Sequence, residues 1–347
     1  MHKKGLAIYT SRSPFFYQDI SILRKNHTVD EYFFKSTKDL NIILSFIKQF
    51  IFLIVRGWKY DFYFISFAQY HSLLPTLFGR LYNLKTYVLV GGTDAHRFPE
   101  FNYGNFNNFW LSIATKYSLK NANYILPKHS SLIESTYTYA TVQFTGQGYM
   151  SFCKDASLQT RSIVIENGYD YKKWFKNVNI QKEKLIITAS SNLGSITQIL
   201  LKGIDIFIEV ADKFPQYTFM IIGEKNLIIK SLPDNVILSE SLSQLELKNI
   251  FSRALIYVQV SMAEGFPNAL CEAMLCECIP IGSDVFGIPT IIDDNRLVLK
   301  EKSVDGLSNI IHNIENNPES YYGKDYRNSI IKRFSIQRRE EKLNEII

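Results

Sequence analysis

Short apolar runs rich in β-branched and aromatic residues alternate with longer amphipathic stretches in the first part of the chain. The runs LAIYT, DFYFIS, KTYVLV and NYILP predict strands, and residues 40–56, 73–82 and 106–121 predict helices. Strands that alternate with helices in this way form parallel sheets with crossover helices. We therefore expect an open α/β domain over residues 1–160.

The same rhythm starts again after the polar stretch KDASLQTRS. Residues 203–214, 245–253 and 267–277 predict its helices, and the predicted strands are SIVI, KLIITAS, YTFMIIG, NVILS, LIYVQV and CIPIG. We expect a second α/β domain over residues 161–325 and a final helix, 326–347, that packs back toward the first domain. Two such domains place a ligand at the carboxyl ends of their strands, in the cleft between them.

Composition narrows the class of protein. The 347 residues exceed one ordinary core, and 46% hydrophobic with 21% charged residues is typical of globular domains. A net charge of +6 is too weak to indicate nucleic acid but suits anionic small molecules or lipid surfaces. The four cysteines lack zinc-ligand spacing, so we expect buried thiols and a cytoplasmic protein.

The most apolar stretch is LNIILSFIKQFIFLIV at residues 40–55. It is shorter than the ~20 residues of a membrane span and includes Lys48, so we expect no transmembrane helix. Two interpretations stay open: a buried crossover helix, or a helix that docks on anionic lipid at the inner membrane face. The second interpretation rests on the cations and interfacial aromatics that follow, which are Arg56, Trp58, Lys59 and Tyr60.

Residues 264–272 read EGFPNALCE and follow a predicted strand. Pro267 is a favoured first helical residue, so Glu264 would lie on the turn and Glu272 in the second helical turn. Gly265 lets the backbone approach a ligand, and the free amides at the helix start favour phosphate. Two carboxylates that bind hydroxyl groups beside a diphosphate site suggest a nucleotide sugar as ligand.

The stretch SMAEGFPNALCEAMLCECIPIGSDVFGIPTII resembles the donor-site signature of the family-four retaining glycosyltransferases. The resemblance extends to KGIDIFIEVA, PDNVILSESLSQLELKNIFSRALIYVQ and IENGYDYKKW, and so covers most of residues 163–300. The amino-terminal half matches loosely, through YDFYFIS and VLVGGTDA. The resemblance implies the GT-B fold, in which two Rossmann-like domains face each other across a cleft.

The resemblance also implies roles for individual residues. Glu264 would contact the donor sugar, Glu272 the ribose hydroxyls, and Lys202 the diphosphate. Asp94 in GGTDA is open between a turn cap and a catalytic role in the cleft, and neighbouring His96 is expected on the surface. The implied donor-binding set is Lys202, Ser241, Leu242, Glu264, Gly265, Phe266, Pro267, Asn268 and Glu272, with Ser241 and Leu242 near the nucleobase.

Three departures from the family pattern concern acceptor handling and catalysis. The Gly-Arg pair after the first strand of the second domain is absent from TASSNLG, so a phosphate-binding cation is missing or comes from elsewhere. Thr290 stands at a usual glutamate position, and Gly91 at a usual histidine position. These departures favour a catalytically silent protein, whereas the glutamate pair and Lys202 favour an enzyme.

We therefore expect a retaining glycosyltransferase that moves a hexose from a nucleoside diphosphate sugar, with UDP-sugar favoured, to a glycan or lipid-linked glycan acceptor. Cell-surface polysaccharide or lipid-linked oligosaccharide synthesis would be its setting. No Asp-x-Asp sequence occurs, so we expect no metal and no cofactor. The alternatives are a silent GT-B subunit that binds a nucleotide sugar or a partner transferase, and a nucleotide-sugar epimerase.

Overall fold

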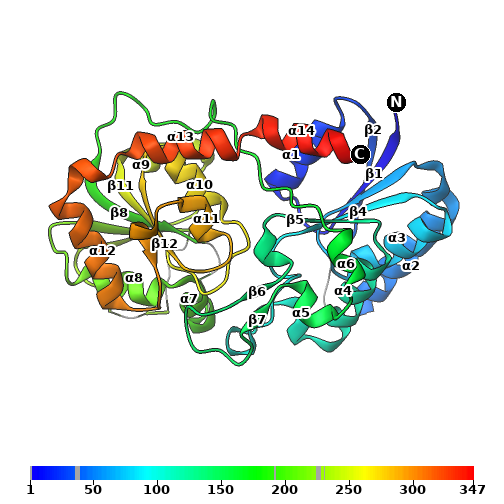
Figure 1. The fold of residues 1–347 in the computed structure, drawn as a ribbon, viewed down its shortest axis with the longest axis horizontal. Helices are drawn as coiled ribbons and strands as arrows, with labels where there is room; N and C mark the ends of the chain where they lie inside the picture. The colour runs from blue at the N-terminus through cyan, green and yellow to red at the C-terminus, as the bar shows by residue number, and fades with distance from the viewer. Residues whose placement is uncertain (1, 36–39, 191–192, 224–227, 230) are drawn as a thin grey trace.

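Five parallel strands form the sheet of the amino-terminal domain in the order β2-β1-β3-β4-β5. A computed structural model describes residues 2–35, 40–190, 193–223, 228–229 and 231–347 of the chain (Figure 1). The strands are β1 (Lys4–Tyr9), β2 (Thr28–Phe33), β3 (Phe62–Ile65), β4 (Lys85–Val90) and β5 (Tyr124–Pro127). The helices of this domain are α1 (Pro14–Leu23), α2 (Leu40–Arg56), α3 (Tyr70–Leu81), α4 (Phe109–Asn121), α5 (Tyr149–Cys153) and α6 (Ser157–Thr160).

The carboxyl-terminal domain has a six-stranded parallel sheet in the order β10-β9-β8-β11-β12-β13. Its strands are β8 (Glu183–Ala189), β9 (Thr218–Ile222), β10 (Val236–Ser239), β11 (Ala254–Gln259), β12 (Ile279–Ser283) and β13 (Val298–Leu299). Its helices are α7 (Ile196–Lys202), α8 (Ile204–Ala211), α9 (Gln244–Arg253), α10 (Asn268–Leu275), α11 (Ile288–Ile292), α12 (Val304–Asn316), α13 (Gly323–Arg333) and α14 (Ile336–Ile346). The expected fold class, α/β with parallel sheets in two domains, is confirmed.

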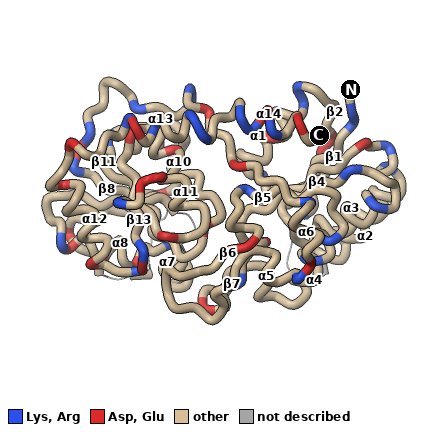
Figure 2. Tube along the Cα trace, in the orientation of Figure 1, with Lys and Arg blue, Asp and Glu red and all other residues tan. Residues whose placement is uncertain are grey.

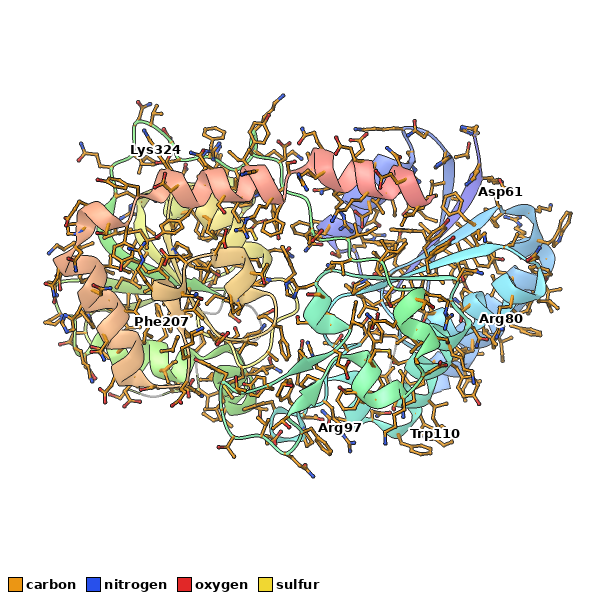
Figure 3. All side chains as sticks on the ribbon, viewed as in Figure 1. Asp61, Arg80, Arg97, Trp110, Phe207 and Lys324 are labelled. Atoms are coloured by element: carbon orange, nitrogen blue, oxygen red, sulfur yellow. The ribbon has the colours of Figure 1, made fainter. Side chains whose placement is uncertain are left out.

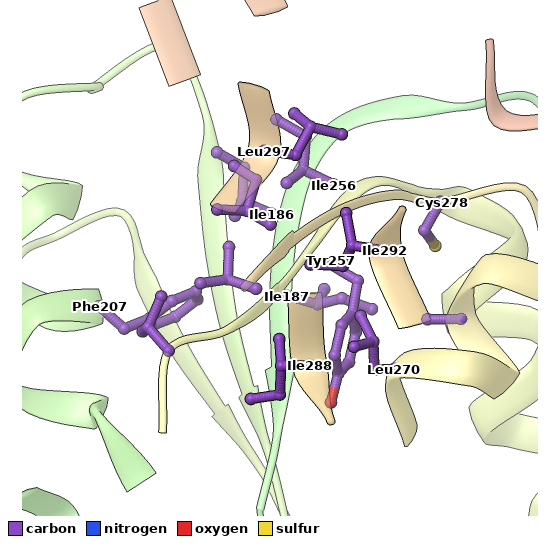
Figure 4. Close-up of a cluster of buried hydrophobic side chains, with 14 of the residues drawn as sticks. Ile186, Ile187, Phe207, Ile256, Tyr257, Leu270, Cys278, Ile288, Ile292 and Leu297 are labelled. Carbon is purple, nitrogen blue, oxygen red and sulfur yellow. The ribbon is translucent and has the colours of Figure 1, made fainter. Parts of the chain in front are cut away.

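The core of the carboxyl-terminal domain explains why its strands read as unbroken apolar runs. Ile186 of β8 and Ile256 of β11 are fully buried at the centre of the sheet (Figure 4). Phe207 of α8 and Leu270 of α10 belong to the same buried cluster. A parallel strand that helices cover on both faces has no solvent-facing side chains, so alternation disappears from its sequence.

The structure corrects several predicted elements. SIVI is not a strand of the second domain: it runs beside β5, where the amide of Ile163 donates to the carbonyl of Ile125 at 2.9 Å. A short apolar run does not reveal which sheet it joins. The predicted helix 267–277 is shorter, because Pro267 is an extended N-cap and not the first helical residue. No element was predicted for strands β2 and β13 or for helices α1, α5, α6, α7, α11 and α12. The single helix predicted over residues 326–347 is two helices, α13 and α14.

The last two helices connect the domains. Helix α13 lies along the carboxyl-terminal domain, and α14 reaches α1 of the amino-terminal domain (Figure 1). Arg339 of α14 donates to both carboxylate oxygens of Asp19 at 2.6 and 2.7 Å, and both side chains are 1% exposed. Leu343 and Ile347 belong to a buried cluster of the amino-terminal domain. The end of the chain therefore holds the two domains together beside the cleft, although the domain boundaries that we predict stay a prediction.

A second connection lies opposite the first. The short antiparallel pair β6 (Ser135–Thr136) and β7 (Gly146–Gln147) carries residues 137–145, which we call the crossing arm. Tyr137 and Tyr139 of this arm are buried in the core cluster of the carboxyl-terminal domain. The carbonyl of Tyr139 accepts a hydrogen bond from the amide of Lys302 at 3.0 Å. The two domains are thus in contact at both ends of the cleft.

Helix α2 occupies the predicted residues 40–56, which confirms the predicted helix. It packs inward through Leu53, while seven apolar side chains are exposed: Ile43, Leu44, Ile47, Phe50, Ile51, Ile54 and Val55. Across the residues that the structure describes, we find no helix with both the length and the apolar character needed to cross a bilayer.

Candidate active site

Lys202 is the last residue of α7, and the glycine after it determines where the helix stops. Gly203 has a φ of +69°, in the left-handed region, and a Cβ there would lie 2.1 Å from the carbonyl oxygen of Val260. Only glycine fits such a C-terminal position without strain. The amide of Met262 donates to the carbonyl of Leu201 at 2.8 Å, so the end of α7 is fastened just beyond β11.

Glu264 forms an ion pair with Lys202, and both side chains are about one fifth exposed. The two residues are 62 positions apart in sequence and meet where β11 and α7 end. This contact brings together the predicted sugar-binding carboxylate and the predicted diphosphate-binding cation.

Gly265 lies against the amino-terminal domain. A Cβ on Gly265 would lie 2.1 Å from the carbonyl oxygen of Gly91, and one on Gly287 would lie 2.5 Å from the carbonyl oxygen of Gly265. Gly92, with a φ of +149°, also faces the amide of Gly265. Three glycine loops from two domains therefore meet at backbone contact, which explains why none of these positions carries a side chain.

The start of α10 has no side-chain cap, because its N-cap residue Pro267 supplies no hydrogen-bonding group. Its first residue, Asn268, is oriented by the segment that crosses between the domains. The side-chain oxygen of Asn268 accepts from the amide group of Asn167 at 2.7 Å and from the hydroxyl of Tyr169 at 2.9 Å. The ring of Phe266 lies nearly parallel to that of Tyr169, with centroids 6.4 Å apart. The first-turn amides are therefore presented by a rigid loop, as an anion site requires.

Glu272 lines a hollow of about 410 Å³ between the two domains. Phe15 and Gln18 of α1 form one wall, and Trp174 and Gln244 contribute from the carboxyl-terminal side. Burial raises the pKa of Glu272 to about 8. The hollow has the size of a small-molecule site, and a desolvated carboxyl group gains most from hydroxyl groups that replace water.

Ser241 and Leu242, which we expect near the nucleobase, follow β10. The hydroxyl of Ser241 is exposed and donates to the carbonyl of Gly223 at 3.4 Å, while Leu242 packs partly against the domain core. They lie just before Gln244, which lines the same hollow as Glu272. Their role in binding the base stays a prediction.

Asp94 is fully buried and holds the GGTDA loop together. Its carboxylate accepts from the amides of Gly91 at 2.9 Å, Gly92 at 3.0 Å and Ala68 at 3.0 Å. Burial raises the pKa of Asp94, and these amides oppose the shift. The carboxylate thus fixes the loop that touches Gly265, and the catalytic role that we predict for Asp94 stays a prediction.

The expectation for His96 is wrong, because this side chain is fully buried and not on the surface. Its ring stacks on Phe286 of the carboxyl-terminal domain, with ring centroids 3.9 Å apart. Phe286 adopts a φ of +48°, which is uncommon for a residue with a side chain. Sequence alone did not reveal this contact, because the two residues come from different domains and 190 positions separate them.

Thr290, at the usual glutamate position, also contacts the amino-terminal domain. Its hydroxyl lies 3.1 Å from Nε2 of His129, whose Nδ1 lies 2.8 Å from the hydroxyl of Ser131. Lys128, next to His129, is buried at the end of β5, and burial lowers its pKa to about 8. Sequence analysis missed both residues; the one available signal was two basic residues directly after a predicted strand, in LPKHS.

Comparison with known proteins gives a family match over part of the sequence and a fold match over nearly all of it. Residues 170–333 match the family described as Glycosyl transferases group 1. Over 99% of both chains, the structure superposes on Anabaena Alr3699/HepE in complex with UDP and glucose, with a TM-score of 0.73 and 13% identity. A similar match, with a TM-score of 0.71 and 13% identity over 99% of this chain and 98% of the other, is to sucrose-phosphate synthase from Thermosynechococcus elongatus. The expected GT-B fold is confirmed.

Two curated relatives give the same class. A phosphatidylinositol N-acetylglucosaminyltransferase subunit from Homo sapiens is 29% identical over 156 residues, 42% of this chain and 31% of the relative. GDP-mannose:cellobiosyl-diphosphopolyprenol alpha-mannosyltransferase from Xanthomonas oryzae is 27% identical over 161 residues, 44% of this chain and 42% of the relative. The chain thus spans less than half the length of these two relatives. The resemblance to the group 1 glycosyltransferases is thus confirmed over residues 170–333.

Proposed function

We propose that the protein transfers a hexose from a nucleoside diphosphate sugar, with UDP-sugar favoured, to a lipid-linked glycan, with retention of anomeric configuration and without a metal ion. The observation that carries the proposal is the Lys202–Glu264 ion pair, which lies beside the uncapped start of α10 and against the GGTDA loop. These groups are a cation, a carboxylate and free amides, which together suit a diphosphate and the sugar attached to it.

The expected reaction depends on leaving-group departure. Lys202 and the first-turn amides of α10 would stabilise the negative charge that grows on the diphosphate as the glycosidic bond breaks. Glu264 would hold the sugar, and Glu272 the ribose. In the retaining glycosyltransferases that the chain resembles, the acceptor hydroxyl attacks the sugar on the face from which the diphosphate departs. The departing phosphate takes the proton of that hydroxyl.

Two lines support the donor and the acceptor. The solved structure of HepE holds UDP and glucose, whereas the Xanthomonas relative is named for GDP-mannose. The relatives are named for phosphatidylinositol and for a diphosphopolyprenol-linked sugar, and both acceptors are lipids. A lipid acceptor fits the exposed apolar face of α2, which we propose docks on anionic lipid.

The test is donor-dependent release of free nucleoside diphosphate from UDP-, GDP- and ADP-sugars, with and without a lipid extract as the source of acceptor. We expect release to rise strongly with the extract, for one donor base above the others, and to continue in EDTA. If the protein binds the nucleotide sugar but releases no nucleoside diphosphate, it is catalytically silent. If it converts the donor sugar into another sugar without releasing nucleoside diphosphate, it is an epimerase. Strict dependence on Mg²⁺ or Mn²⁺ would contradict the metal-free reaction.

A further inference from the structure

A basic groove lies on the amino-terminal domain, outside the candidate active site. Two adjoining hollows, of about 530 and 490 Å³, share Lys116 of α4 and Lys154 after α5. Lys120 lines the first hollow and Arg97 the second. We call the two hollows together the α4–α5 groove.

Among the described residues, the cations of this groove have no acidic partner at ion-pair distance. Within the described parts of the chain, no ion pair or side-chain hydrogen bond is formed by Arg97, Lys116, Lys120 or Lys154. Asp155 is the acidic residue on the lining, and its carboxylate accepts from the amide and hydroxyl of Ser157. Four cations and one carboxylate line the groove, which makes it positive. Figure 2 shows Lys and Arg positions near α4 and α6, with an acidic position beside α4.

Arg97 is positioned for a ligand in particular. Its guanidinium group stacks 4.1 Å from the ring centre of Phe144, and its Nε is buried without a hydrogen-bond partner. The fully buried side chain of Gln147 fixes the backbone of Arg97, with hydrogen bonds of 3.0 Å to its amide and its carbonyl. A buried donor without a partner costs stability unless a ligand accepts from it.

The position of the groove suggests what that ligand is. Helix α4 carries the exposed rings of Phe109 and Trp110 in its first turn, and Trp110 and Arg97 lie along the same edge of the domain (Figure 3). At its other side the groove reaches Phe144 and Thr145 of the crossing arm, which contacts the carboxyl-terminal domain. A molecule with an apolar tail at the rings would place its anionic group among the cations.

We propose that the α4–α5 groove binds the phosphate or diphosphate group of a lipid-borne ligand. Assigning this phosphate to the acceptor rests on the proposed function. Binding of phosphate in the groove can be tested independently of that function. Lys116 and Lys154 lie at the junction of the two hollows, so an anion there contacts both. Arg97, which lines the second hollow, carries a guanidinium group of the kind that phosphate favours.

The first test uses inorganic pyrophosphate as the probe, followed by calorimetry. Lys116→Ala/Lys154→Ala should weaken its binding at least tenfold, Lys116→Arg/Lys154→Arg should retain it, and the exposed Lys324→Ala on α13 is the matched control. Each titration is repeated in the Lys202→Ala background, which weakens anion binding at the donor site. In the unaltered protein, pyrophosphate should also slow acetylation of Lys116 and Lys154 but not of Lys324.

The second test separates the two sources of phosphate. If Lys116→Ala/Lys154→Ala, the groove variant, floats less with phosphatidylglycerol vesicles than the unaltered protein, the bound anion is a bilayer headgroup. If the groove variant loses pyrophosphate binding but floats equally well, the anion belongs to the acceptor. Equal pyrophosphate affinity in the groove variant and in Lys324→Ala, with no protection from acetylation, would overturn the site. Titration with UDP reports the donor site separately, so failure of the proposed function is distinguishable.

Discussion

The two domains share one architecture but differ in what their surfaces expose. In the carboxyl-terminal domain, charge and helix ends gather at Lys202, Glu264 and the start of α10, and exposed large apolar residues are scattered. In the amino-terminal domain, exposed apolar residues are concentrated on α2, the adjoining α3 and α4, with unpaired lysines beside them. The first surface suits a small anionic donor, and the second suits a lipid boundary.

This difference explains why the carboxyl-terminal domain carries recognisable family motifs and the amino-terminal domain matches only loosely. The donor site that we propose needs particular residues at particular strand ends, so its motif is recognisable, and the family match covers residues 170–333. A membrane-facing surface requires only apolar and basic character, which many residue combinations supply. The comparison therefore predicts sharp effects of single substitutions in one domain and graded effects in the other.

The largest effect is expected from Lys202→Ala. The cation faces charge that grows as the donor bond breaks, so kcat/KM should fall by at least about tenfold to a hundredfold. Nucleotide-release kinetics measure the loss, and Lys213→Ala, which breaks a surface ion pair with Asp305 in the same domain, is the control. Lys202→Arg should recover part of the activity; full activity of Lys202→Ala would remove this lysine from the mechanism.

The two glutamates should separate into different kinetic roles. Glu272→Ala should weaken donor binding by about 1 to 3 kcal/mol, because buried hydroxyl groups lose their partner. Glu264→Gln should lower kcat more than it raises KM, since its partner is the reacting sugar. Calorimetry with the nucleotide and steady-state kinetics report the two effects. Equal losses of donor affinity in both variants would contradict the division.

The apolar face of α2 should respond gradually. Ile47→Glu/Ile51→Glu should reduce flotation with phosphatidylglycerol vesicles by about tenfold, or ~1.4 kcal/mol, and should leave donor binding unchanged. High salt should weaken binding of the unaltered protein, since each cation near the membrane contributes roughly 1 kcal/mol that screening removes. Val178→Glu, at an exposed apolar position just before β8, is the control. No association with any vesicle would favour a soluble acceptor.

The last prediction concerns the pH dependence of stability at Glu272. Its pKa is raised to about 8 by burial, so from about pH 4.5 to 8 the unfolded chain releases a proton that the folded protein retains. The contribution of Glu272 to the free energy of unfolding is therefore fully present below this pH window. It is lost as the pH rises through the window, by at most about 1.4 kcal/mol per pH unit. Glu272→Gln should be the more stable protein by a margin that widens from pH 5 to 8. Denaturant unfolding measures it, and parallel curves would show an ordinary carboxyl group.

The positions of most strands along the chain followed from sequence. The apolar runs KTYVLV and LIYVQV correspond to β4 and β11. A parallel strand that is buried on both faces consists almost entirely of apolar residues, so it can be recognised from sequence. The EGFPNALCE segment predicts Glu264 and Glu272 as site residues, because a turn followed by a helix start is local geometry that a short segment can encode. Each of these signals spans fewer than ten residues.

Only the tertiary structure decided which distant residues meet. The Lys202–Glu264 pair, the stack of His96 on Phe286 and the contact of His129 with Thr290 join segments 62 to 190 positions apart. Side-chain burial is likewise a property of the folded chain, which is why His96 was expected on the surface. Sequence periodicity reports one element at a time, whereas the cleft, the hollow at Glu272 and the α4–α5 groove arise where several elements pack together.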